Sequence, residues 1–167
     1  LRGTTGPVRV NKGLQRNPLY DVFVEAGVQA GYARSANMNE RQHEGFGPME
    51  MNIGDGRRMS AARAYLRPAM ARGNVHVVTG AMVDRVLFDG RRAIGVEYRQ
   101  KGETLTARAR REVIVACGAI ASPQLLLLSG VGDKAQLARH EIRVVAEVPG
   151  VGRNLEDHPA AQLQWQG

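Results

Sequence analysis

Two places in this 167-residue sequence combine residue types and spacing that could support chemistry. The first is Ala116-Cys117-Gly118-Ala119, which ends an apolar run and precedes a predicted helix. Ligands of open α/β sheets bind beyond the carboxyl ends of the strands. Small residues there let a cofactor approach the backbone, and the following helix directs its amide dipoles at it. A tight turn without any ligand explains the same spacing, so the residues alone leave both interpretations open.

The second place is the glycine turn Pro149-Gly150-Val151-Gly152, followed by Asn154-Leu155-Glu156-Asp157-His158. A GxG turn can approach a phosphate group, but it forms a bare turn equally well. His158 is the one histidine that we retain as a candidate, because it directly follows this turn. The other three show no metal-ligand spacing and are expected to be structural or exposed: His43, His76 and His140. We therefore predict no metal site.

Cys117 is the only cysteine of the chain. No histidine lies near it in the sequence, and a small apolar filler suits it better than a nucleophile. A single cysteine cannot form an internal disulfide, which fits a reducing compartment. We expect a cytoplasmic protein, and a peripheral membrane location of a parent enzyme stays open. The sequence has no transmembrane segment, because no apolar run reaches 18 residues, and its first residues do not resemble a signal peptide.

The composition is typical of a soluble globular protein, with 43% hydrophobic and 23% charged residues. It excludes a disordered chain, a collagen and a disulfide scaffold. The net charge of +7 would permit anionic partners. The arginines are spread along the chain without interleaved aromatic residues, so we predict no nucleic-acid partner. A non-catalytic basic module that binds anionic partners remains the alternative function. The densest basic pieces are Arg57-Arg58, Arg91-Arg92 and Arg108 to Arg111.

Helical periodicity appears twice in the first half of the chain. Asn17 can cap a helix with Pro18 at its first position, and Gly31 ends it. Its predicted apolar face consists of Leu19, Val22, Phe23, Ala26 and Ala30. A second helix is expected to begin near Ser60.

The middle of the chain has the pattern of strands. Asp89-Gly90 and Lys101-Gly102 indicate tight turns between alternating segments, so we predict a β-meander. The expected strands cover residues 75–79, 81–88, 93–98 and 104–109. Residues 112–116 (EVIVA) lack alternation, as expected of a strand buried on both faces of a parallel sheet.

The last third of the chain returns to alternating helix and strand. Ser122 and Pro123 are expected to begin a helix that ends after Leu128. A short helix over 133–140 and a strand over 142–148 follow. The predicted fold class is therefore α/β, a mixed α and β arrangement with a meander as a crossover connection.

Several motifs together resemble the glucose–methanol–choline (GMC) flavoprotein oxidoreductases. Residues 118–132 (GAIASPQLLLLSGVG) satisfy every constrained position of the family's second signature. Residues 44–48 resemble its substrate-side loop, 56–66 its GxRxSxAxxYL stretch, and 149–158 its PGVGxNLxDH segment. Among the family's members, choline dehydrogenases and related alcohol dehydrogenases look most similar.

The resemblance implies part of a doubly wound FAD-binding domain, with the β-meander as its crossover, and part of a substrate-binding domain. Residues 1–56 would belong to the substrate-binding domain and residues 57–152 to the FAD-binding domain. Within the latter, the meander would cover about 75–109 and the buried strand 112–116. Residues 153–167 would return toward the substrate domain.

The resemblance also implies FAD as the cofactor, bound in an extended form. By the family's pattern, Val83 would contact the adenine through its backbone. The turn of small residues would pass near the adenosine, with Cys117 where an Ala is usual. The segment after the glycine turn would pass near the flavin. The implied cofactor-binding residues are Val83, Cys117, Gly118, Ala119, Asn154, Asp157 and His158.

The implied activity is oxidation of a primary alcohol, choline-like or other, to the aldehyde by hydride transfer to the flavin. The partners would be a small alcohol and an electron acceptor. Choline-oxidising members tend to place a Glu where this chain has Ala160, on the substrate side, which favours an alcohol other than choline. The family's GxGxxG loop and catalytic His pair are absent from these residues. We therefore expect no catalytic residue in this chain, no activity of the fragment alone, and self-association through its exposed edges.

Overall fold

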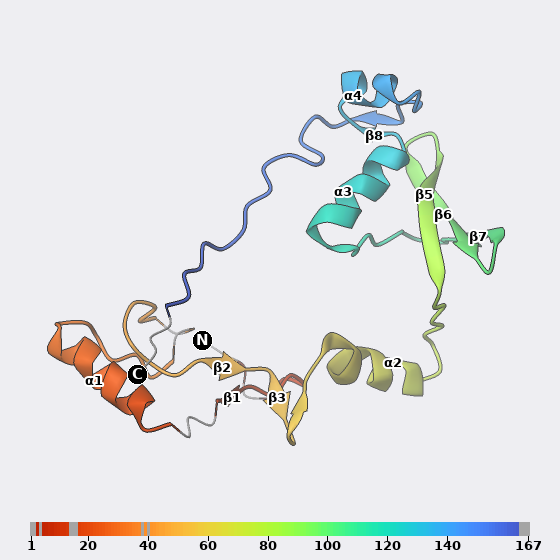
Figure 1. The fold of residues 1–167 in the computed structure, drawn as a ribbon. Helices are drawn as coiled ribbons and strands as arrows, with labels where there is room; N and C mark the ends of the chain where they lie inside the picture. Colours follow the sequence, from red (N-terminus) through yellow and green to blue (C-terminus); the bar gives the residue numbers. More distant parts are fainter. Residues whose placement is uncertain (1–2, 4, 14–16, 38, 40, 164–167) are drawn as a thin grey trace. The chain divides into compact units, whose positions relative to one another are not determined.

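A computed structural model of the chain describes residue 3 and residues 5–13, 17–37, 39 and 41–163. The chain forms two compact units, residues 1–77 and 78–167 (Figure 1). Both units combine helices with strands, which agrees with the predicted α/β class. The assignment of residue ranges to an FAD-binding and a substrate-binding domain stays a prediction.

Helix α1 (Leu19–Gln29) begins one residue later than the sequence predicts, with Pro18 in the cap position, and it ends just before Gly31 as predicted. The Leu19 N–H donates to Asn17 Oδ1 at 3.0 Å. The predicted apolar face is not the buried one: Leu19 and its neighbours on that face are exposed, and the buried residues are Val24 and Gly27. The Phe46 ring explains the difference. It lies where a Cβ on Gly27 would come within 2.5 Å, so the loop packs on the helix face that a glycine leaves flat.

Two short strand pairs and a helix with a π-helical first turn complete the first unit. The antiparallel pairs are β1 (Asn11–Lys12) with β2 (Glu50–Met51), and β3 (Ile53–Gly54) with β4 (Arg57–Arg58). Ser60 begins the second helix as predicted, with its Oγ accepting from the Arg63 N–H. This helix starts with the π-helical turn η1 (Ala62–Leu66) and continues as α2 (Arg67–Ala71). Pro68 lies in α2, where it cannot donate the usual backbone bond to the preceding turn.

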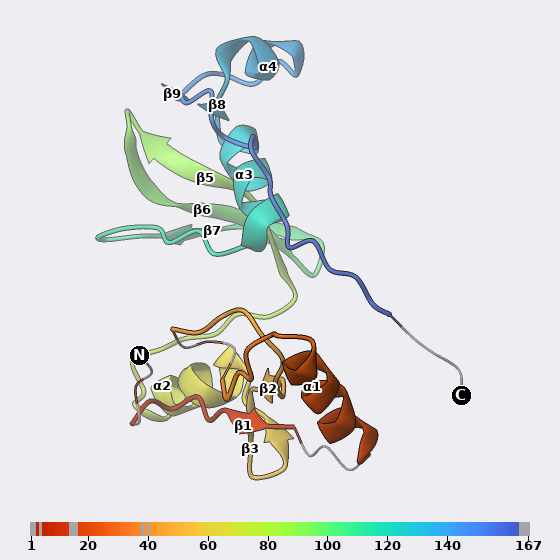
Figure 2. The ribbon, with the colours of Figure 1, turned by 90° about the vertical axis from the view of Figure 1, so that its left-hand side faces the viewer.

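The predicted meander is confirmed in the second unit (Figure 2). Its antiparallel strands are β5 (Ala81–Asp89), β6 (Arg92–Gln100) and β7 (Glu103–Arg108). The first turn is Gly90–Arg91, one residue later than predicted, because Asp89 pairs with Arg92. In the second turn Lys101 and Gly102 both have positive φ, the geometry that matches the twist of paired strands.

Two predicted strands are not formed. Residues 75–79 are not paired into a strand, and neither are residues 112–116. The second segment is also not buried, since Ile114 is 79% exposed. A strand buried on both faces needs a neighbouring strand on each side. No described strand pairs with residues 112–116, so their apolar sequence has no sheet to enter here.

Helix α3 (Gly118–Leu128) starts at the glycine rather than at Pro123 as predicted, and Pro123 lies inside it. Ser122 does not cap the helix; its Oγ accepts from the Cys117 N–H at 3.0 Å. Helix α4 (Lys134–Arg139) is capped by Asp133. The parallel pair β8 (Val131–Gly132) and β9 (Ala146–Glu147) brackets it, so the strand expected over 142–148 is limited to two residues. No helix in the described part of the chain is long and apolar enough to cross a membrane.

Candidate functional site

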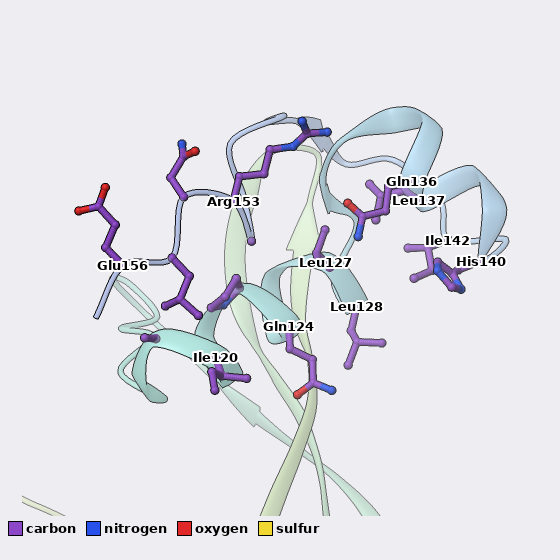
Figure 3. Close-up of a pocket in the computed structure, with 15 residues that line it drawn as sticks. Ile120, Gln124, Leu127, Leu128, Gln136, Leu137, His140, Ile142, Arg153 and Glu156 are labelled. Atoms are coloured by element: carbon purple, nitrogen blue, oxygen red, sulfur yellow. The ribbon is translucent and has the colours of Figure 1, made fainter. Parts of the chain in front are cut away.

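A cavity of about 990 Å³ lies in the second unit, bounded by α3, α4 and residues 152–156 (Figure 3). Its walls carry large apolar side chains, namely Ile120, Leu127, Leu128, Leu137, Ile142 and Leu155. Polar groups also line it, namely Gln124, Gln136, His140, Arg153, Asn154 and Glu156. This mixture of apolar walls and a few polar groups is the usual lining of a small-molecule or cofactor pocket.

Sequence reasoning missed most of this lining. The helical spacing within α3 could have indicated one wall of the cavity. On this helix the residues that line the cavity recur every four positions on one face, namely Ala119-Ile120, Pro123-Gln124 and Leu127-Leu128. His140 was predicted to be structural or exposed. It is exposed at the end of α4, and it also lines the cavity.

The turn before α3 has the conformation and the open space that a ligand needs. Gly118 has φ +85°, a conformation that L side chains rarely adopt, and nothing lies within 4 Å of a Cβ placed there. Cys117 beside it is an exposed free thiol. No acidic residue lies in the first turn of α3, so no carboxylate of the helix offsets the partial positive charge of its amino end.

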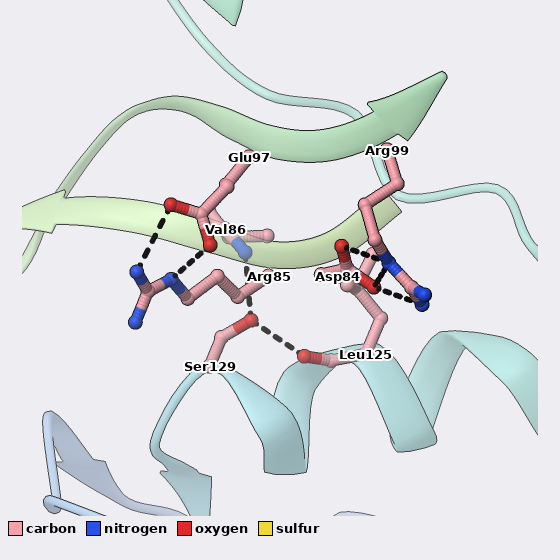
Figure 4. A network of polar contacts seen from close by, with 7 residues as sticks. All are labelled: Asp84, Arg85, Val86, Glu97, Arg99, Leu125 and Ser129. Carbon is pink, nitrogen blue, oxygen red and sulfur yellow. Dashed lines mark hydrogen bonds and ion pairs between the residues drawn. The ribbon is translucent and has the colours of Figure 1, made fainter. Parts of the chain in front are cut away.

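Strand β5 carries a bulge next to Val83. Val83 pairs with Tyr98 and the next paired residue is Arg85, which leaves Asp84 as the extra residue. The Asp84 carboxylate accepts two hydrogen bonds from Arg99 (Figure 4). Arg99 Nε donates to Oδ2 and Nη2 donates to Oδ1, each at 2.8 Å. A bulge redirects side chains and increases strand twist locally. The ion pair fixes the side-chain direction of Asp84, immediately after the predicted adenine contact.

These charges shift one another's titration. The Arg99 hydrogen bond holds the pKa of Asp84 below its ordinary value, and burial opposes this shift in part. The hydrogen bond to Glu97 raises the pKa of Arg85, and the bond to Asp84 raises that of Arg99. Exposed ion pairs add little stability. We therefore assign these pairs a role in shaping the strand rather than in holding the unit together.

Ser129 connects α3 to β5. It is 7% exposed, and its Oγ accepts from the Val86 N–H at 2.8 Å and donates to the Leu125 carbonyl (Figure 4). Val86 and Leu125 are themselves buried, so the contact lies in the core of the unit. This bond fixes the helix that begins at Gly118 against the strand that carries Val83.

The structure brings together only some of the predicted site residues. Ala119 and Asn154 both line the cavity. Asn154 has φ +57°, a conformation that Asn tolerates better than most residues. Val83 is half-buried on β5 and does not line it.

Cys117 and Gly118, at the start of α3, do not line the cavity, and the other predicted residues follow it in a segment without helix or strand. Asp157, His158 and Ala160 are exposed there and do not line the cavity. Asp157 Oδ1 accepts from the backbone N–H of His158 at 2.8 Å. In the described residues, no cluster of three or more His, Cys, Asp or Glu could hold a metal ion.

The sequence profile of the GMC oxidoreductases matches residues 1–160. This chain belongs to the GMC oxidoreductase family. The resemblance drawn from the four motifs is thereby confirmed. FAD is the cofactor that membership of this family supports. The residues present fit it, because Gly118 leaves its backbone open and no described strand pairs with β5 on the side away from β6, where Ser129 bonds the Val86 N–H.

Curated relatives match this GMC chain along nearly its whole length. The oxygen-dependent choline dehydrogenase of Brucella anthropi is 50% identical over 165 residues, which are 99% of this chain and 30% of that protein. The protein of the same name from Burkholderia vietnamiensis is 52% identical over 166 residues, 98% of this chain and 29% of that protein. The chain therefore spans about 30% of the length of these relatives.

Solved structures of two oxidases resemble the fold. Pyridoxine 4-oxidase from Mesorbium loti superposes with a TM-score of 0.85 at 31% identity, covering 94% of this chain and 31% of that one. A formate oxidase variant from Aspergillus oryzae RIB40 has a TM-score of 0.85 at 26% identity, covering 93% of this chain and 27% of that one.

Proposed function

We propose that this chain forms part of an FAD-dependent oxidoreductase that oxidises a primary alcohol to the aldehyde. The observation that carries the proposal is the family match over residues 1–160, supported by 50% identity to an oxygen-dependent choline dehydrogenase. Bound FAD would accept the hydride that the alcohol loses and pass the electrons to an acceptor. The small-molecule alcohol and that acceptor are the proposed partners.

Within this enzyme, the residues of the chain bind and orient the cofactor. The backbone of Val83 on the edge strand and the open turn from Cys117 to Ala119 would hold the adenosine half. The exposed amide of Asn154, at the rim of the cavity, and the following Asp157-His158 would lie on the flavin side. We assign no proton-transfer step to any residue of this chain.

The proposed substrate is an alcohol other than choline. A quaternary ammonium group gains little on leaving water unless a carboxylate or an aromatic box replaces its hydration. The family's choline-oxidising members tend to place a Glu at the position of Ala160, and the residues on either side of it here are Pro159 and Ala161. The names of the curated relatives favour choline instead, so the two predictions differ in a measurable way. A kcat/KM for choline above those for aliphatic and aromatic alcohols would contradict the argument from Ala160.

Substitution of Gly118 tests the binding role. We expect Gly118→Ala to lower the FAD affinity of the full-length protein, because the added methyl fills the space beside the turn and strains a backbone at φ +85°. Gly102→Ala is the matched control, since Gly102 has φ +86° and equally open surroundings in the β6–β7 turn. The measurement is flavin fluorescence on titration of the apoprotein. Equal affinities of the two variants, or a full-length protein without flavin absorbance, would count against the proposed function.

Three further properties belong to this proposal. The fragment alone would be inactive, because its sequence carries neither the family's GxGxxG loop nor its catalytic His pair. Turnover of the purified 167 residues with FAD and an artificial acceptor above a free-flavin blank would contradict this.

Exposed apolar residues such as Ile114 support self-association of the fragment, which sedimentation at increasing concentration would detect. The exposed free thiol of Cys117 supports a cytoplasmic location.

A further inference from the structure

Five arginines that are separate in the sequence gather at one end of the β5–β6–β7 sheet. Arg91 occupies the β5–β6 turn, and Arg92 begins β6. Arg108 ends β7, where it pairs with Gly95 near the start of β6. Arg92 Nη2 donates to the Arg110 carbonyl at 3.5 Å, which joins the turn to the loop after β7. We call this set the meander-end arginines: Arg91, Arg92, Arg108, Arg110 and Arg111.

The positive charge of the meander-end arginines is not neutralised within the described part of the chain. All five are exposed. The ion pairs of the second unit involve other arginines, namely Arg85, Arg99 and Arg153. Asp89 and Glu112 are the acidic residues beside the set in the sequence, and neither makes an ion pair with it. A local excess of like charge attracts anionic partners and repels cationic ones.

The residues around these arginines indicate which kind of anionic partner fits. Residues 89–93 and 107–112 contain no aromatic and no large apolar side chain, only Gly, Ala, Asp and Glu beside the arginines. The exposed Ile114 follows them, but it belongs to the apolar run that the sequence predicts to enter the sheet of the parent enzyme. Single-stranded nucleic acid is bound largely through stacking on aromatic side chains. Specific protein interfaces rely on buried aromatic or apolar anchors. A layer of anionic lipid headgroups requires neither, because basic residues near its surface are attracted by the surface potential alone.

We propose that the meander-end arginines form a docking surface for an anionic phospholipid layer. The contact is peripheral and electrostatic, and it weakens as salt increases. It is independent of the alcohol oxidised, because none of these arginines lines the cavity or is among the residues assigned to FAD. It assigns a role to two of the dense basic pieces in the sequence, Arg91-Arg92 and Arg108 to Arg111.

The test uses the full-length, flavin-loaded protein and two kinds of vesicle, pure phosphatidylcholine and an equal mixture of phosphatidylcholine with phosphatidylglycerol. Co-sedimentation at low salt measures the fraction bound. We expect binding to the anionic vesicles only. The triple variant Arg91→Gln, Arg110→Gln, Arg111→Gln should bind the anionic vesicles on the order of 100-fold more weakly. Each basic residue near such a surface raises the binding constant about fivefold, and three of them are removed. Arg92 is left intact because its side chain bonds the Arg110 carbonyl.

A matched control removes the same charge elsewhere. Arg67, Arg72 and Arg139 are exposed and make no ion pair with a described residue. Their triple substitution by Gln should leave most of the vesicle binding intact. Equal loss of vesicle binding in both triple variants would show that only the net charge of the protein matters, and this would overturn the proposal. Binding of the wild type to the neutral vesicles alone would also overturn it. Tighter binding to a DNA fragment or to polyglutamate, lost in the Arg91/Arg110/Arg111 variant, would assign the surface to those polymers instead. Unchanged flavin absorbance in each variant verifies that the fold is intact.

Discussion

The substitution Ser129→Ala tests the contact that holds α3 against β5. The Ser129 Oγ accepts from the Val86 N–H at 2.8 Å, and Ser129 and Val86 are 7% and 5% exposed. The hydroxyl also donates to the Leu125 carbonyl, one turn earlier in the helix. Removing it leaves a buried N–H of an edge strand without an acceptor. The carbonyl is less affected, because it also accepts from the Ser129 N–H.

We expect this substitution to lower the free energy of unfolding by about 1–3 kcal/mol. This is the usual cost of leaving one buried donor unsatisfied, whereas loss of a hydrogen bond that water replaces costs about 1 kcal/mol or less. The assay is urea unfolding of the full-length protein followed by circular dichroism. The slope of the transition should not change, since little surface exposure is altered.

Ser122→Ala is the matched control on the same helix. Its Oγ also accepts a backbone bond, from Cys117, but that N–H belongs to an exposed residue that water can reach. We expect the Ser122 variant to lose less stability than the Ser129 variant by about 1 kcal/mol. Equal losses in the two variants would refute the argument from burial.

Two further predictions concern the backbone and the titration of the second unit. Gly130→Ala should destabilise it by about 2–4 kcal/mol, because the new Cβ would lie 2.3 Å from the Arg143 carbonyl and φ is +84°; an unchanged urea midpoint would contradict this. Asp84→Asn should flatten the fall of stability in acid: the pKa of Asp84 is lowered in the folded state, so its contribution is full above the unfolded value and is lost as the pH falls below about 4. Superimposable pH profiles of unfolding for Asp84→Asn and the wild type would show that this ion pair is energetically silent.

Local chemistry made several elements predictable. The polar contact of Asn17 and the stop at Gly31 depend only on neighbouring residues: Asn17 accepts from the first N–H of α1, although Pro18 occupies the cap position, and the helix ends just before Gly31. The meander strands alternate, and tight turns with glycines join them, so their order and approximate limits were fixed by period and turn type. The family was recognisable from the Gly118–Gly132 signature for the same reason, since its constraints are local.

Features that depend on distant partners were not predictable from pattern. The spacing along α1 predicts which residues share its apolar face, but Val24 and Gly27 are buried instead, where Phe46 packs from a loop against Gly27. Residues 112–116 have the composition of a buried strand, but none of them is buried, because burial requires neighbouring strands that composition cannot supply. The cavity wall consists of residues from α3, α4 and 152–156, and the pattern within any one of these segments does not predict that they meet.

The sequence by itself determined the family, the meander and the turn of small residues before α3, because each rests on contacts between residues close in the chain. Tertiary structure alone decided how Arg91-Arg92 and Arg108 to Arg111 relate. They are two short basic pieces along the chain, and the antiparallel register of β6 with β7 makes them one surface. It also decided that Ser129 contacts Val86 and that Ala119 and Asn154 share a cavity. Pairing register and packing set these distances, and both depend on residues far apart in sequence.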